Sequence, residues 1–270
     1  MEDPASMTPL PCSLVVDSGY SYSHIVPIYN NKPIRAAVQR VNIGGRHLTN
    51  LLKQTLSTRY FDLQQETQIV NDIKHQLCFV STDFEADLAI SKLKKAGQNT
   101  LRREYFLPDF LTTFQGHVRD PALSVMQVPV DGEQPFVPLS NERFSIPEML
   151  FRPADVGISQ CGLAEAVMQS LAKCPPELVG PLLSNIICVG GTFMMPQAAQ
   201  RLQKDIRALA PDVLPVRVHT SLTPTLTNWH GAAAFVNACG SADAFAHQFS
   251  VSKAEWADMG ESAIARKCNV

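Results

Sequence analysis

The sequence lacks the cysteine pairs that a zinc ribbon or a disulfide framework needs. None of its seven cysteines forms a C-x-x-C pair, and they are scattered at Cys12, Cys78, Cys161, Cys174, Cys188, Cys239 and Cys268. Such a distribution is typical of a reducing compartment, where a buried thiol behaves as a small hydrophobe. The histidines form no H-x-x-x-H or H-E-x-x-H pattern, so a histidine metal centre is not expected.

An excess of charge of one sign is also absent. The chain has 23 Lys and Arg against 25 Asp and Glu, a formal net charge of −2, and no basic block that could follow a nucleic-acid backbone. Direct binding of nucleic acid is therefore not expected. The most apolar internal run, 186–196, is far shorter than the ~20 residues of a membrane-spanning helix, so no membrane partner is expected either.

The N-terminus lacks the basic start and apolar core of a secretory signal. We expect residues 1–11 to form an unstructured leader and the protein to be nuclear or cytosolic. With 45% hydrophobic and 18% charged residues, the remainder has the composition of an ordinary soluble globular protein.

The first half of the chain predicts strands followed by helices. Residues 13–19 and 23–29 are typical of a β-hairpin, and 34–43 indicates a third strand. Apolar residues at helical spacing predict helices over 46–58 and 69–80, within a helical insertion that spans 46–115. Residues 116–139 contain Gly, Pro and Asp without periodicity, which predicts a long surface loop.

The second half alternates helices with strands. The pattern predicts, in order, helix 159–173, strand 185–189, a helix opened by Pro196, strand 215–219 and helix 228–239. This order favours an α/β fold with a mixed sheet covered on both faces, built from residues 12–45 and 140–270.

One short motif indicates phosphate binding. Asp17, Ser18 and Gly19 end an apolar strand and enter a tight turn. Asp17 could hold a metal-bound water, Ser18 could donate a hydrogen bond to a phosphate, and Gly19 lets backbone amides approach it closely. A phosphate clamp of this kind needs two such arms, and the motif occurs once.

Six motifs in order resemble those of the actin family over about residues 12–268. They are Asp17-Ser18-Gly19, Gly44-Gly45-Arg46-His47-Leu48-Thr49, Ile69-Val70-Asn71-Asp72-Ile73-Lys74, Asn141-Glu142-Arg143-Phe144, Gly190-Gly191-Thr192 with Met194, and Arg266-Lys267-Cys268. The resemblance implies the actin-like (ribonuclease H-like) ATPase fold. It also implies that the second large domain is present with its helical insertion, and that the first domain is mostly absent.

Several departures make the chain more similar to an actin-related protein than to conventional actin. Tyr20, Ser21 and Tyr22 follow the first motif in place of acidic and glycine residues, and Phe110 ends a Leu-Pro-Asp-Phe run where actin has glycine. These features resemble the nuclear actin-related subunits of complexes that place a variant histone into nucleosomes.

The resemblance also implies a nucleotide site. Asp17 would lie near the water shell of a magnesium ion, with Ser18 and Gly19 at the phosphates of ATP or ADP. The nucleoside would be contacted by Gly45, Lys74, Gly190, Gly191, Thr192 and Met194.

Other departures argue against tight nucleotide binding. His75 stands where a glutamate would hold the ribose, Asn71 replaces an arginine, and Thr225 replaces a lysine beside the adenine. Because charge-assisted contacts contribute roughly 1.5–3 kcal/mol each, losing a few of them could remove most of the affinity. ATP hydrolysis is therefore not expected.

Three functions remain open at this point. The first is a non-catalytic scaffold in a nuclear chromatin-remodelling complex, with the complex subunits as partners and histones reached only through them. The second is a cytoskeletal, nucleotide-binding switch or weak ATPase of the actin type. The third is a fragment whose uncovered apolar domain face prevents stable function.

Overall fold

The computed structural model describes residues 11–60, 62–95, 97–111, 113–120 and 135–268. The chain divides into two compact units, 1–224 and 225–270, each of which is considered by itself. Within the described ranges, no helix combines the length and apolar character needed to cross a membrane.

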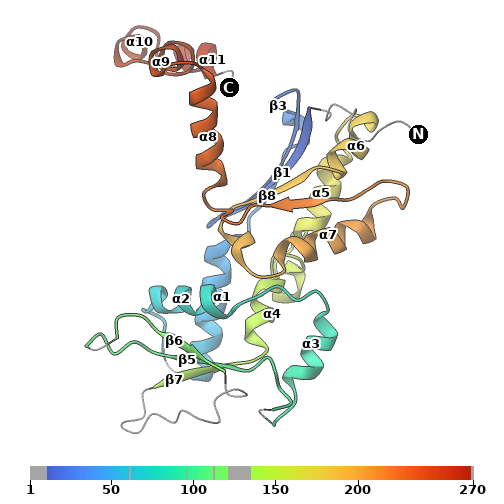
Figure 1. The fold of residues 1–270 in the computed structure, drawn as a ribbon, viewed down its shortest axis with the longest axis vertical. Coiled ribbons are helices and arrows are strands. Elements are labelled where there is room, and N and C mark those ends of the chain that lie inside the picture. The colour runs from blue at the N-terminus through green and yellow to red at the C-terminus, as the bar shows by residue number, and fades with distance from the viewer. Residues whose placement is uncertain (1–10, 61, 96, 112, 121–134, 269–270) are drawn as a thin grey trace. The chain divides into compact units, whose positions relative to one another are not determined.

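The first unit is built on a mixed sheet (Figure 1). Its strands are β1 (Cys12–Ser18), β2 (Ser23–Tyr29), β3 (Lys32–Pro33), β4 (Gln39–Val41), β8 (Ile186–Val189) and β9 (Val218–Thr220). The order is β3-β2-β1-β8-β9, and β4 also pairs with β2. β1 runs antiparallel to β2 and parallel to β8, which itself runs parallel to β9. The prediction of an α/β fold with a mixed sheet is confirmed.

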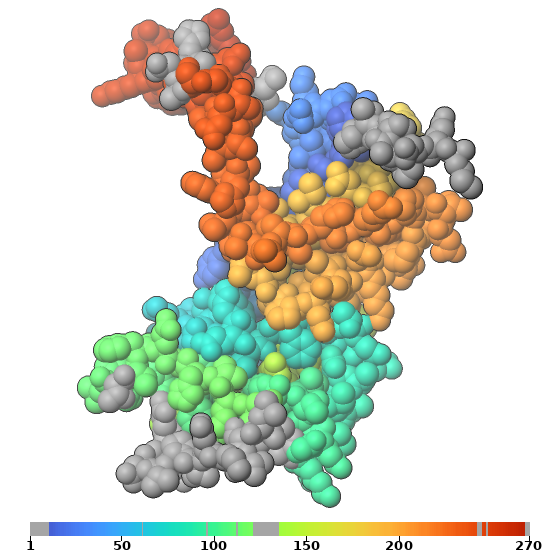
Figure 2. Space-filling model, in the orientation of Figure 1, coloured from blue at the N-terminus to red at the C-terminus, as the bar shows by residue number. Residues whose placement is uncertain are grey.

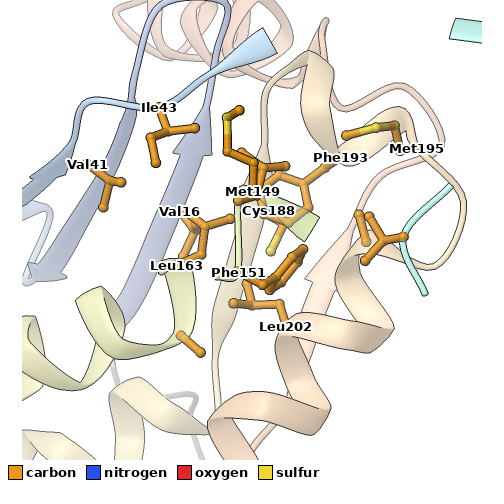
Figure 3. Packing of buried hydrophobic residues seen from close by; sticks show 14 of the residues in the cluster. Val16, Val41, Ile43, Met149, Phe151, Leu163, Cys188, Phe193, Met195 and Leu202 are labelled. Atoms are coloured by element: carbon orange, nitrogen blue, oxygen red, sulfur yellow. The ribbon is translucent and has the colours of Figure 1, made fainter. Parts of the chain in front are cut away.

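One face of this sheet is fully buried under helices. α5 (Leu163–Leu171) and α7 (Ala198–Leu209) pack against each other and against the strands, and α6 (Pro176–Leu183) contacts β1. Val16 and Cys188 gather in one cluster with Leu163 and Leu202 (Figure 3). The alternate residues of β1 are only half-buried in the described chain, whereas the sequence predicted a sheet covered on both faces.

The segment between β4 and α5 folds into helices and a second, smaller sheet. The helices are α1 (Gly45–Arg59), α2 (Thr67–Leu77), α3 (Phe84–Ser91) and α4 (Glu142–Glu148). The small antiparallel sheet has the order β6-β5-β7, formed by β6 (His117–Arg119), β5 (Arg103–Phe106) and β7 (Phe136–Leu139). In Figure 1 it lies next to α1 and α2.

The structure corrects three sequence-based expectations. The predicted surface loop 116–139 is wrong at both ends, where β6 and β7 pair with β5; residues 121–134 lie outside the described ranges. Pro196 does not open α7, because a short 3-10 helix (Gly191–Met194) and the left-handed Gln197 (φ 67°) precede it. The predicted strand 34–43 is reduced to β4 by a 3-10 helix at Arg35–Ala37.

A buried ion pair joins α7 to α4. Arg201 donates to both carboxylate oxygens of Glu148, over 2.8 and 2.7 Å, and to the backbone carbonyl of Ser81 over 2.7 Å. Both charged side chains are at most 6% exposed, and the guanidinium lies 5.0 Å from the ring centre of Phe151. The pair therefore joins three distant parts of the chain inside the first unit.

The second unit consists of helices. They are α8 (Thr227–Ala238), α9 (Ala242–Phe249), α10 (Lys253–Met259) and α11 (Glu261–Cys268). Ser252 and Glu255 form a capping box that starts α10. Hydrogen bonds from Lys267 and from the Ser252 backbone and hydroxyl lower the pKa of Glu255 to about 2, and Lys267 thereby joins α11 to α10.

Replacing Arg201 tests the buried ion pair. Arg201→Met removes both short hydrogen bonds to the buried Glu148 carboxylate and leaves it only the longer contact with the exposed Arg152, so we expect a loss of about 3–5 kcal/mol in unfolding free energy. Arg152→Met is the matched control, because Arg152 is exposed and lies 3.6 Å from the same carboxylate; it should cost less than about 1 kcal/mol. Urea denaturation followed by circular dichroism measures both, and equal losses would contradict the assignment.

Candidate functional site

The two glycine-containing turns of the predicted site lie side by side. Parallel pairing of β1 with β8 sets Asp17 opposite Val189, so the turn after β1 meets the turn after β8. Thr192, which is buried, donates from its hydroxyl to the carbonyl of Ser18 over 2.8 Å. Residues 174 positions apart in the sequence are thus joined directly.

Gly190 is the point of closest approach between these turns. Its φ of +97° lies in a region that side chains other than glycine rarely adopt. A Cβ atom there would lie 2.3 Å from the Ser18 carbonyl oxygen and 2.9 Å from Oδ1 of Asp17. Glycine is therefore required at this position by both backbone conformation and space.

A third element, the start of α1, packs on the first turn. The amides of Gly45 and Arg46 donate to the carbonyls of Gly19 and Tyr20, over 2.9 and 2.7 Å. A Cβ on Gly44 would lie 2.7 Å from the Tyr20 oxygen, so this glycine is also needed for close approach. Sequence reasoning selected Gly45 and missed this role of Gly44, although the Gly-Gly pair was the visible signal.

The turn after β1 uses its own donors internally. The amide of Gly19 donates to the carbonyl of Tyr22 over 3.1 Å. The hydroxyls of Ser18 and Ser23 lie 2.7 Å apart, and Ser23 donates to the carbonyl of Ile43. Because Ser23 has a single hydroxyl hydrogen, Ser18 must be the donor to Ser23. Both serines have no exposed surface, so the Ser18 hydroxyl belongs to the core.

Lys74 is likewise occupied by protein atoms. Its ammonium donates to the carbonyl of Gly45 over 3.2 Å, to the hydroxyl of Thr49 over 2.9 Å and to the amide oxygen of Asn71 over 2.8 Å. These three neutral acceptors match its three hydrogens. Burial lowers the pKa of Lys74. Lys74 therefore joins α2 to α1, and Asn71 supplies an acceptor where an arginine would supply another cation.

The other predicted residues lie at the edge of this arrangement. Asp17 and Gly191 are half-buried, whereas Met194, at the end of the short helix, is 51% exposed. The hydrogen bonds and close contacts above unite Asp17, Ser18, Gly19, Gly45, Lys74, Gly190 and Thr192. Three described cavities of about 290–370 Å³ are lined by other residues.

Three of the groups that the resemblance assigns to a nucleotide are hydrogen-bonded within the protein. The hydroxyl of Ser18, the amide of Gly19 and the ammonium of Lys74 already donate to protein acceptors. In the described ranges, no group of three or more His, Cys, Asp or Glu residues could hold a metal ion. These hydrogen bonds form a structural junction between the sheet, α1 and α2.

Gly190→Ala tests the contact between the two turns. We expect a loss of about 3 kcal/mol or more in unfolding free energy, because the strained backbone costs about 1–3 kcal/mol and the overlap with Ser18 adds to it. Gly97→Ala is the control, since a Cβ there meets nothing within 4 Å. Chemical denaturation compares the two variants, and a Gly190→Ala protein as stable as the control would contradict the assignment.

Comparison of the sequence with known proteins identifies the family of the chain. The sequence model described as Actin matches residues 6–269. Actin-related protein 6 of Arabidopsis thaliana is 35% identical over 274 residues, which cover 95% of this chain and 63% of the relative. The proteins of that name from Neurospora crassa and Drosophila melanogaster are 36% and 37% identical, over 96% and 85% of this chain and 60% and 56% of their own lengths.

The chain therefore spans about three fifths of the length of these relatives. The family match extends over both units and includes every motif on which the predicted resemblance was based. The resemblance is confirmed: the chain belongs to the actin family.

Proposed function

We propose that the chain is a non-catalytic actin-related subunit of a nuclear chromatin-remodelling complex of the histone-variant exchange type, where it acts as a protein-interaction scaffold. Its partners are subunits of that complex, and it reaches histones only through them. Similarity to proteins named actin-related protein 6 supports the choice of assembly.

The internal pairing of the donors in the glycine turns carries the non-catalytic part of the proposal. A phosphate could use Ser18 or Gly19, and a nucleoside could use Lys74, only by replacing hydrogen bonds that the protein already makes. Exchanging one hydrogen bond for another contributes little net free energy, since a typical bond is worth about 0.5–1.5 kcal/mol. The hydrogen bonds among the turn, α1 and α2 therefore serve to hold these elements together.

One observation favours the alternative of a nucleotide-dependent switch. Asp17 and His24 lie directly opposite each other in the β1–β2 register, on the half-buried face of the sheet. A carboxylate and an imidazole on one face could together orient a water molecule. His24 also packs edge-on against Tyr22, with ring centres 4.8 Å apart, which gives it a structural role without a nucleotide.

Nucleotide binding separates the two functions. We expect a fluorescent ATP analogue with magnesium to show no saturable binding below about 1 mM, because the Ser18 hydroxyl and the Gly19 amide, which would meet its phosphates, are hydrogen-bonded within the protein. Fluorescence polarisation of the full chain measures this, with conventional actin as the positive control. Micromolar affinity that falls in Asp17→Asn and His24→Ala would contradict the scaffold proposal and favour the switch.

Purification from cells tests the proposed assembly. A tagged chain expressed at native level should co-purify from nuclei with the ATPase subunit of a histone-exchange complex, in near-stoichiometric amount and in the presence of a nuclease. Quantitative mass spectrometry measures the ratio, with the tag alone as control. Recovery with cytoskeletal proteins and without a remodelling ATPase would contradict the assignment.

A further inference from the structure

An exposed apolar loop follows β5 in the small sheet. In residues 107–111 and 113–116, which we call the apolar loop, Phe110 is 57% exposed, Phe114 is 73% exposed and Leu111 is 86% exposed. The green segment that carries β5 and β6 lies at the surface in Figure 2. Large apolar side chains gathered at one place on a surface are typical of protein interaction sites.

The apolar loop is held in a defined conformation. Oδ1 of Asp109 accepts hydrogen bonds from the amides of Leu111 and Thr113, over 2.9 and 2.7 Å. The amide of Phe110 donates to the carbonyl of Thr113 over 3.0 Å, which closes the turn. The described residues on both sides of the turn are therefore hydrogen-bonded to each other, which reduces the entropy that a partner must remove on binding.

Phe110 itself is in a conformation that glycine would adopt more easily. Its φ is +57°, in the left-handed region that is unfavourable for a bulky residue. This is the position where the sequence departs from the Leu-Pro-Asp-Gly run of actin. Phe110 is more than half exposed, so packing of its side chain within the described chain offsets little of the energetic cost of the strained backbone.

A cavity of about 370 Å³ lies against the apolar loop. It is lined by Glu66, Gln68, Ile69, Asn71, Asp72, His75, Tyr105, Pro108, Phe110, Phe114, Gln115 and Gly116. Ile69, Pro108, Phe110 and Phe114 are its large apolar lining residues, and its ionisable groups include Glu66, which precedes α2, and Asp72 and His75 within α2.

The charge of this cavity is negative. Glu66 and Asp72 are its carboxylates, and no Lys or Arg lines it. Asp72 accepts a hydrogen bond from the hydroxyl of Tyr105 over 2.5 Å, which fixes the carboxylate at the cavity wall. Burial, together with the charge of Lys74, lowers the pKa of His75, so the imidazole adds little positive charge at pH 7.

We propose that the apolar loop and this cavity form a docking surface for a segment of a protein partner that is both apolar and basic. An aliphatic or aromatic side chain of that segment packs between Phe110, Phe114 and Ile69. A neighbouring Lys or Arg pairs with Glu66 and Asp72. The surface does not depend on the nuclear assembly proposed above, and it serves any partner with this chemistry.

Selection from a random peptide library tests the proposal directly. A phage-displayed library of 16-residue peptides is panned on the full chain, and the enriched sequences are synthesised and measured by fluorescence polarisation. We expect an apolar anchor flanked by Lys or Arg, and an affinity that weakens as salt is raised because charge pairs contribute to it.

Two variants assign the binding to this surface. Phe110→Gly relieves the backbone strain and removes the ring, so the chain should remain folded while peptide affinity falls at least tenfold. Glu66→Lys should weaken the same peptides and reduce their salt dependence. Leu222→Ser is the matched control, because Leu222 is a fully exposed apolar residue of the first unit outside this surface; it should leave binding unchanged.

Several results would overturn the proposal. They are the absence of enrichment over an unrelated protein, enrichment of acidic peptides, and binding that Phe110→Gly leaves intact. Sedimentation equilibrium supplies a further outcome. A dimer of the full chain that Phe110→Gly dissociates would show that a second copy occupies the surface, in place of a basic partner segment.

Discussion

The parallel pairing of β1 with β8 is the constraint on which the rest of the first unit depends. It joins the N-terminal hairpin to a strand more than 150 residues later in the sequence, and it sets Leu14, Val16 and Asp17 opposite Ile186, Cys188 and Val189. A shift of one residue would turn the buried residues of β1 away from α5 and α7. The same register brings Ser18 to Gly190 and Thr192, so the core and the glycine turns are fixed together.

The hydrogen bonds around these turns give the motifs of the actin family a structural role in the first unit. The start of α1 donates to the carbonyls of Gly19 and Tyr20, and Lys74 joins α2 to Gly45 and Thr49. Gly45, Arg46 and Lys74 thereby hold neighbouring elements together. By contrast, the loop that follows β5 in the small sheet exposes Phe110 and Phe114 to solvent. These two side chains are therefore largely uncovered within the described chain.

Local patterns predicted much of this fold. Leu48, Leu52 and Leu56 recur at helical spacing, and all three are buried along α1 as that spacing requires. The β-rich composition of the hairpin strands and the glycine motifs were equally visible. By contrast, β6 and β7 were missed because they are short strands whose stability comes from pairing with β5, a non-local contact that no local pattern reports.

The sequence indicated which residues lie together at the candidate site but not which atoms their side chains contact. Motif order identified Ser18, Gly19 and Lys74, but which acceptors their hydrogens meet depends on tertiary packing. Backbone conformation at Gln197 and Phe110 was also beyond reach, since both adopt left-handed values that their residue types rarely favour.

The most direct test of the account observes the Lys74 ammonium group itself. Nitrogen-15 NMR of the lysine side chains, with the Lys74 signal assigned from a Lys74→Arg variant, reports whether its hydrogens are protected by protein acceptors. We predict a resolved, slowly exchanging ammonium signal that does not move when millimolar Mg-ATP is added. A rapidly exchanging signal, or one that shifts with saturation at micromolar Mg-ATP, would contradict the claim that this site is a closed structural junction.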